Sequence, residues 1–139
     1  MSTPKLPLGD RRRAATTDDT TALLIRARGF IERGWCQGAN AKDKNGQPVS
    51  IWSDQAVAWC AAGALFAAGI APDHNCWEYP VVVNLANNLL QKAIGRDRSI
   101  QAFNDRQWRV RPVLAAFDRA IALAEMVSTG VSSAEGETR

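Results

Sequence analysis

The three cysteines of the chain are the residues best suited to chemistry, and each of them lies beside a tryptophan. The only histidine, His74, would complete a set of four zinc ligands, but the paired Cys-x-x-Cys spacing of structural zinc sites is missing. Free cysteines are usually buried as small hydrophobic residues. We therefore predict core cysteines packed against aromatic rings, without a metal or another cofactor. The pairs are Trp35-Cys36, Trp59-Cys60 and Cys76-Trp77.

A cysteine nucleophile is the sharpest enzymatic hypothesis, with His74 as base and Asn104 or Asp105 orienting it. Cys36, however, follows the end of an expected helix and Cys60 lies inside one, and neither position activates a thiol as a helix start does. Carboxylate catalysis stays open as an alternative if several aspartates meet in space. The sequence has no phosphate-binding loop, dinucleotide fingerprint or His-Glu-x-x-His motif. The aspartates concerned are Asp43, Asp54, Asp105 and Asp118.

Arginines gather in segment 96–111, RDRSIQAFNDRQWRVR, with Trp108 among them. Arginine beside an aromatic ring can bind phosphate groups and stack on bases, and the same two residue types anchor protein interfaces. The acids Asp97 and Asp105 dilute the positive charge, so a protein partner is favoured over nucleic acid. We predict an exposed binding surface made of Arg106, Trp108, Arg109 and Arg111.

Bulk composition places the chain among globular proteins. Its 139 residues are 46% hydrophobic and 22% charged, with a net charge of +3, which is a small excess for a dedicated nucleic-acid binder. The apolar stretch 56–72 is too short and too weakly hydrophobic for a membrane helix. Three cysteines are an odd number, which suits a reducing compartment better than a disulfide framework. We predict a cytoplasmic protein without a membrane segment and leave its oligomeric state open.

Hydrophobic periodicity and turn residues predict a mainly α fold, a compact four-helix domain at residues 17–127. We predict that residues 1–16 form a flexible basic arm and that residues 128–139 form a disordered tail. The dipeptide Asn45-Gly46 predicts a small hairpin or an irregular loop at 39–51, between the first two helices. The helices are expected from Thr17 to Gly34, from Ser53 or Asp54 to Gly69, from Pro80 to Gly95, and from Pro112 onward.

Two helix faces can be assigned from spacing. In the second helix, small residues recur four, three and four positions apart and should let another helix approach closely. In the third helix, apolar residues recur at helical spacing and should face the core. The small residues are Ala56, Cys60, Gly63 and Ala67, and the apolar residues are Val82, Leu85, Ala86, Leu89 and Ala93.

The motifs GWCQGA, AWCAAGAL and FND follow one another along the chain. As a set they resemble an uncharacterised family of small bacterial and phage proteins, from about Leu23 to Ala124. Phe103 is a departure, because a tryptophan commonly precedes Asn-Asp in that family. The resemblance supplies no reaction, but it implies that one structural or functional unit contains Trp35, Gln37, Asn104 and Asp105.

These patterns favour a small non-catalytic binding or regulatory protein. A phage accessory protein that acts on a host protein system is one form that this role takes. One alternative is nucleic-acid binding through segment 96–111. The other is a small hydrolase or ligand-binding protein that uses the region of Gln37, Asn104 and Asp105. A cleft in which these side chains converge with Asp43 would favour the last alternative. A flat arginine-aromatic surface would favour a macromolecular partner.

Overall fold

The computed structural model describes residues 17–69, 79–96 and 99–137. The prediction of a mainly α fold is confirmed, but the described residues form five helices rather than four. A small antiparallel sheet of two strands accompanies them. In chain order the elements are α2 (Thr17–Arg33), β1 (Ala41–Lys42), β2 (Ala58–Trp59), α3 (Ala61–Gly69), α4 (Tyr79–Ile94), α5 (Ile100–Arg106) and α6 (Arg111–Glu137).

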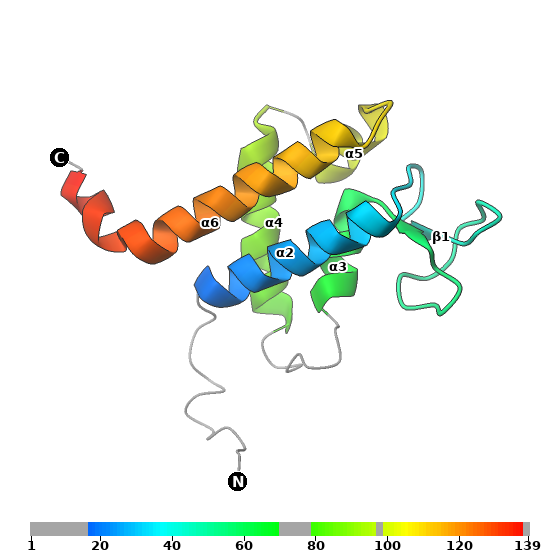
Figure 1. Ribbon diagram of the computed structural model, residues 1–139, viewed down its shortest axis with the longest axis horizontal. Helices are drawn as coiled ribbons and strands as arrows, with labels where there is room; N and C mark the ends of the chain where they lie inside the picture. The colour runs from blue at the N-terminus through cyan, green and yellow to red at the C-terminus, as the bar shows by residue number, and fades with distance from the viewer. Residues whose placement is uncertain (1–16, 70–78, 97–98, 138–139) are drawn as a thin grey trace, which may run out of the picture.

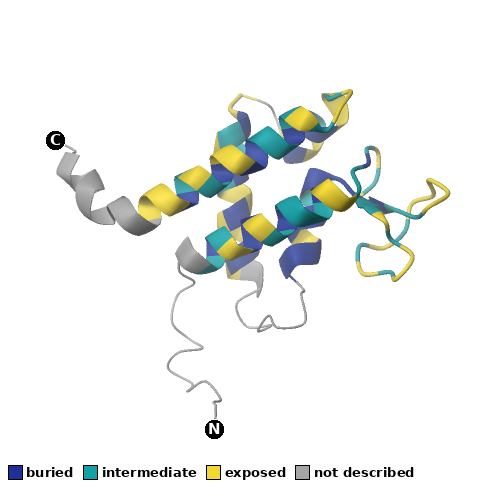
Figure 2. Cartoon of the chain, viewed as in Figure 1, coloured by how far each residue is buried: buried dark blue, intermediate teal, exposed yellow. Residues whose placement is uncertain are grey.

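The long helices form two layers. Helices α2 and α6 lie side by side in one layer, and α4 crosses behind them next to α3 (Figure 1). Apolar residues at helical spacing explain this packing: Leu23, Ala27 and Ile31 of α2 are buried. The sides of the helices that face one another are the buried ones, whereas the outer sides are exposed (Figure 2). The core is completed by residues such as Leu65, Ala86, Leu90, Val113, Phe117 and Ala120.

Helix α3 begins later than we predicted, at Ala61 instead of Ser53 or Asp54. The reason is that Ala58 and Trp59 pair with Lys42 and Ala41 as strands. A continuous run of small and apolar residues satisfies helix and strand patterns alike, so the distant pairing decides. The prediction that Cys60 lies in mid-helix is therefore wrong, because this residue immediately precedes the helix.

The stripe of small residues is only partly helical, and one of its members lies against a loop. Ala56 and Cys60 lie outside α3. At Gly63 a Cβ atom would lie 2.0 Å from the backbone oxygen of Asn40. Only glycine fits this close approach to the chain that enters β1, while α3 also packs against α2 and α4.

The Asn45-Gly46 turn forms as predicted. The Asp43 N–H donates to Gln47 O and the Gly46 N–H to Asp43 O, each at 2.9 Å. Gly46 adopts φ +81°, which glycine allows at no steric cost. Beyond the turn, Lys42 bridges Pro48, and β1 then pairs with β2, whereas we expected pairing only between the flanks of the turn.

Helix α4 exposes part of the face that we expected to be buried. Val82 and Ala86 are buried as predicted, whereas Leu85 is 38% exposed. Leu90 and Ile94 are buried instead. The buried stripe follows residues four apart, because α4 contacts α2, α3 and α6 along that row.

The predicted terminal segments fall partly outside the structure. Segment 1–16, predicted as an arm, lies outside the described residues. Helix α6 continues through Glu137, past the domain boundary at residue 127 that we expected. None of the described helices combines the length and the apolar character needed to cross a membrane.

Candidate functional site

Asn104 lies at the centre of a buried polar network. The residue is fully buried, with 0% of its surface exposed. The Oδ1 atom accepts hydrogen bonds from Trp35 Nε1 at 2.8 Å and from the Ala61 N–H at 3.0 Å. The Nδ2 group donates to Cys36 O at 3.1 Å and to Asp105 Oδ1 at 3.0 Å. Both acceptor and both donor positions of the amide are thus occupied.

Gln37 and Asp105 extend this network to the backbone. Gln37 Nε2 donates to Asn104 O at 2.9 Å and also to Gln107 O. Asp105 Oδ1 accepts from the Gly38 N–H at 3.2 Å. These contacts join the segment after α2 to the end of α5 and, through Asn104, to the start of α3.

The predicted unit of Trp35, Gln37, Asn104 and Asp105 is therefore present, and we name these four residues the Asn104 junction. Their hydrogen bonds satisfy backbone groups at helix ends and in loops, which are costly to bury unpaired. An amide with every hydrogen-bonding position used inside the protein has nothing left to offer a substrate. The arrangement of the Asn104 junction is thus that of a structural support.

The thiols of Cys36 and Cys60 are poor nucleophiles in this fold. Both cysteines are free and buried, as predicted. Burial raises the pKa of Cys36 to about 11. Burial is also the main reason that the pKa of Cys60 is raised, although the hydrogen bond from the Gly63 N–H opposes it. Both groups are therefore protonated at neutral pH, and the protonated thiol does not attack.

Other parts of the cysteine and zinc hypotheses lie outside the described residues, namely His74, Cys76 and Trp77. Among the residues that the structure does describe, no three histidine, cysteine or acidic side chains come close enough together to hold a metal ion.

The four aspartates considered for catalysis lie in separate parts of the structure. Asp43 Oδ1 accepts from the Asn45 and Gln47 N–H groups, each at 2.9 Å, inside the turn. Asp105 belongs to the Asn104 junction, and Asp54 is exposed in the loop before β2. Asp118 lies on α6 and pairs with Arg28. The structure does not bring these carboxylates together.

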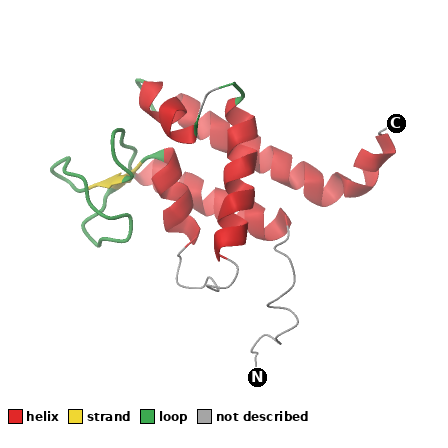
Figure 3. Ribbon diagram, turned by 180° about the vertical axis from the view of Figure 1, so that it is seen from behind, coloured by secondary structure: helices red, strands yellow, loops and turns green. Residues whose placement is uncertain are grey.

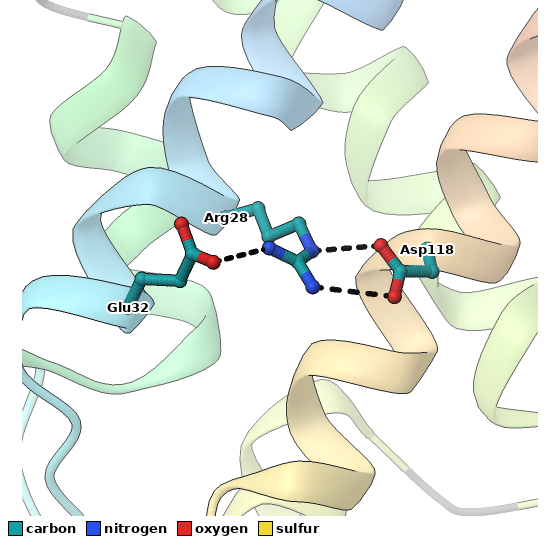
Figure 4. A network of polar contacts seen from close by, with 3 residues as sticks. All are labelled: Arg28, Glu32 and Asp118. Carbon is teal, nitrogen blue, oxygen red and sulfur yellow. Dashed lines mark hydrogen bonds and ion pairs between the residues drawn. The ribbon is translucent and has the colours of Figure 1, made fainter.

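Several arginines hold the helices together. Arg28 of α2 donates to Asp118 Oδ1 at 2.7 Å and to Glu32 Oε2 at 2.7 Å (Figure 4). The hydrogen bond to Asp118 is the main reason that the pKa of Arg28 is raised. Arg26 and Arg119 each place two nitrogens on a backbone oxygen in the last turn of another helix, Ala68 in α3 and Ala93 in α4. These contacts satisfy carbonyls that a helix end leaves free.

Trp108 lies in the short connection between α5 and α6, and its side chain is 84% exposed. The prediction of an exposed ring is confirmed. The Arg109 guanidinium carbon lies 5.1 Å from the ring centroid, within cation–π range. Arg106 and Arg111 are exposed on either side in sequence. We name the group of Arg106, Trp108, Arg109 and Arg111 the Trp108 surface.

The Asn104 junction supports the Trp108 surface directly. Gln107, the residue before Trp108, donates its N–H to Asn104 O at 3.3 Å and its side-chain Nε2 to Phe103 O at 2.9 Å. Its carbonyl accepts from Gln37. The backbone that precedes the exposed Trp108 ring is therefore fixed, because both the N–H and the carbonyl of Gln107 form hydrogen bonds. Sequence spacing did not reveal this support, because Gln37 lies far from Gln107 along the chain.

Two of the hollows on the described surface lie near residues discussed above. One, of about 420 Å³, is lined by Trp35, Gln37, Lys42 and Asp43 among others, and the second, of about 390 Å³, lies between Trp52 and Phe66. Neither hollow is lined by Asn104 or Asp105. Neither of these two hollows is therefore the cleft expected for the hydrolase alternative, in which Gln37, Asp43, Asn104 and Asp105 converge.

Comparison with known proteins identifies the family. The model of a family of unknown function, DUF6197, matches residues 15–123, so the chain belongs to that family. No curated protein and no solved structure gives a significant match.

Proposed function

We propose that this member of a family of unknown function is a non-catalytic binding protein that docks an acidic protein surface through the Trp108 surface. The observation that carries the proposal is the exposure of Trp108. An indole ring that is 84% in solvent contributes little to the fold, and tryptophan and arginine are enriched among the residues that dominate interface energies.

Rigid support for this ring favours binding. Ordering a mobile side chain or loop on association costs free energy. Here the backbone of Gln107 is already held by Asn104 and Gln37. Arg109 stacks against the indole, so both side chains are partly arranged before a partner arrives.

The charges of the Trp108 surface select an acidic partner. Arg106, Arg109 and Arg111 are exposed, while the neighbouring Asp105 has one oxygen engaged by Gly38 and Asn104. Arginine binds carboxylates through two parallel hydrogen bonds, which gives geometric specificity as well as attraction. Acidic side chains around an apolar recess for the indole would complement this surface.

Nucleic acid is the alternative partner for the same residues. Three arginines around one aromatic ring offer few phosphate contacts, and single-strand binders usually combine a longer basic groove with several stacking rings. We therefore place nucleic acid second, as an outcome that the test below distinguishes.

Affinity capture by the folded, tagged chain tests the proposal. The double variant Arg109→Glu, Arg111→Glu should lose an acidic protein partner that the wild type retains, because both guanidinium groups then repel it. Arg96→Glu changes an exposed arginine outside the Trp108 surface and is the matched control. Treatment with nuclease should leave the capture intact. If nuclease abolishes it, or if the double variant captures as much partner as Arg96→Glu, the proposal is wrong.

The cytoplasmic location, the regulatory role and the phage origin are predictions from the sequence. If they hold, the partner is a host protein with an acidic surface.

A further inference from the structure

The hollow of about 420 Å³ is lined by three segments of the chain: the residues after α2, the chain from β1 into the turn at Gly46, and the start of β2. The two strands and the loops around them project from one side of the helices (Figure 3). The volume lies within the range of small-molecule sites. We name this cavity the Trp35 hollow, and its lining includes Trp35, Gln37, Lys42, Lys44 and Val57.

The lining of the Trp35 hollow has an excess of positive charge. Of the three lysines among the described residues, Lys42 and Lys44 line the hollow, while Lys92 lies on α4. Neither Lys42 nor Lys44 forms an ion pair within the part of the chain that the structure describes. Asp43 offsets one of the two charges, and its Oδ1 atom is held by two N–H groups of its own turn. The uncompensated positive charge favours an anion in the hollow.

Lys42 is the better placed of the two lysines. Burial is the main reason that the pKa of Cys36 is raised to about 11, and the charge of Lys42 opposes this rise. Because Cys36 also lines the hollow, the ammonium group of Lys42 lies within electrostatic range of that wall. Its backbone is fixed by pairing with Ala58 and by accepting from the Val57 N–H at 2.9 Å. Lys42 is half-buried, so salt screens its charge less than that of an exposed lysine.

Trp35 gives the hollow an aromatic wall. Its Nε1 atom donates to Asn104 Oδ1 at 2.8 Å, so the orientation of the half-buried ring is set before any ligand arrives. Gln37 is held through Nε2 by two backbone oxygens, and its Oε1 atom accepts no hydrogen bond from the described residues. Val57, 46% exposed, adds apolar surface. A fixed ring, an apolar side chain and a spare acceptor are typical of a preformed ligand site.

We infer that the Trp35 hollow binds a small organic anion, a flat ring that carries a carboxylate or a phosphate group. The ring packs against the Trp35 indole and Val57, and the anionic group lies at Lys42 and Lys44. Gln37 Oε1 accepts a hydrogen bond from a ring substituent. Lysine binds either anion as a point charge, so the lining defines the shape and the charge of the ligand, and the experiment separates the carboxylate from the phosphate.

Titration of the full, isotope-labelled chain, followed by NMR, tests this inference with two probes. Naphthoate carries a carboxylate on a flat ring system, and adenosine monophosphate carries a phosphate. At least one of them should give saturable shifts of the Trp35 indole N–H and of the Val57 and Ala58 amides. The neutral counterparts, naphthamide and adenosine, should bind at least about tenfold more weakly, because they lack the charged group that Lys42 and Lys44 contact. Inorganic phosphate, which lacks a ring, should also bind more weakly than the probe.

The double variant Lys42→Met, Lys44→Met removes both charges and should weaken binding of the probe at least about tenfold. Lys92→Met is the matched control, because it removes an exposed lysine on α4, and it should leave the Kd unchanged. Val57→Glu adds a negative charge to the lining at an exposed position and should weaken binding too. Circular dichroism checks folding, and Val57→Glu serves as the test if the double variant does not fold.

Four results would overturn the inference: neither probe binds at the hollow, the neutral counterparts bind as tightly as the probes, inorganic phosphate binds as tightly as adenosine monophosphate, or the double variant binds as tightly as Lys92→Met. Capture through the Trp108 surface uses neither Lys42 nor Lys44. Failure of this inference is therefore distinct from failure of the proposed function.

Discussion

Replacing Asn104 with alanine removes the amide at the centre of the Asn104 junction. The change leaves Trp35 Nε1, the Ala61 N–H and Cys36 O without the partners that now lie 2.8, 3.0 and 3.1 Å away. A buried polar group that loses its partner costs about 1 to 3 kcal/mol. The hydrogen bonds to the Ala61 N–H and Cys36 O are buried and the one from Trp35 is part-buried, so we expect Asn104→Ala to lower the free energy of unfolding by at least about 2 kcal/mol.

Denaturant unfolding and thermal melts measure this loss. At about 3 °C for each kcal/mol, the Tm should fall by at least about 6 °C. Asn88→Ala removes an exposed amide on α4 and should change stability by no more than about 0.5 kcal/mol. Asn104→Asp keeps the shape and one acceptor but loses both donors and faces the Asp105 carboxylate, so it should also be destabilised. An Asn104→Ala protein as stable as Asn88→Ala would refute the structural role of the Asn104 junction.

Three further predictions concern the core and the helix contacts. Gly63→Leu should unfold or rearrange the domain, because its Cβ would lie 2.0 Å from Asn40 O; a thermal melt checks this against Gly29→Ala, where a Cβ meets nothing within 4 Å. Cys36 and Cys60 should resist thiol reagents in the folded chain. Because the pKa values of both thiols are raised in the folded chain, the free energy of unfolding should fall as the pH rises above 9, and for Cys36 this fall should continue to a pH of about 11. Rapid labelling of Cys60 in the native protein would contradict its burial. So would a pH profile of stability that Cys36→Ser leaves unchanged. A double-mutant cycle of Arg28→Ala and Asp118→Ala should give a coupling free energy of about 0.2 to 1 kcal/mol that salt reduces, since the ion pair is partly exposed. A larger coupling free energy that salt leaves unchanged would contradict this prediction.

Long helices with a regular apolar period were predictable from the sequence. Helix α2 carries Leu23, Ala27 and Ile31 on one face and ends before Gly34, where a Cβ would lie 2.0 Å from Val57 O. Helix α4 likewise begins and ends close to the predicted residues. In both cases local spacing and glycine or proline at the ends contain most of the information.

The missed elements depend on contacts between distant residues. Strand β2 lies in a run of small and apolar residues that also suits a helix, and its pairing with Ala41 and Lys42 decides the outcome. Helix α5 is only one or two turns long. Ser99 caps it by accepting a hydrogen bond from the Ala102 N–H at 3.0 Å, a signal that was available in the sequence. Burial of Ile100 and Phe103 then holds it against the core.

The candidate site was predictable by residue type but not by role. The motif resemblance grouped Trp35, Gln37, Asn104 and Asp105 correctly, and the arginine-rich surroundings of Trp108 indicated an exposed ring. Full burial of Asn104, with every hydrogen-bonding position of its amide occupied, could not be inferred, because the partners include residues from two distant segments, Trp35-Cys36 and Ala61.

The most direct test of the proposed function compares two exposed tryptophans. Trp108 and Trp52 are 84% and 70% exposed, so replacing either with alanine should cost little stability, which a thermal melt verifies. The affinity of the captured acidic partner is then measured for the wild type, Trp108→Ala and Trp52→Ala. Loss of an interface anchor costs about 2 kcal/mol or more, which is about thirtyfold in Kd. We predict that loss for Trp108→Ala and none for Trp52→Ala, whereas equal affinities for the two variants would contradict binding through the Trp108 surface.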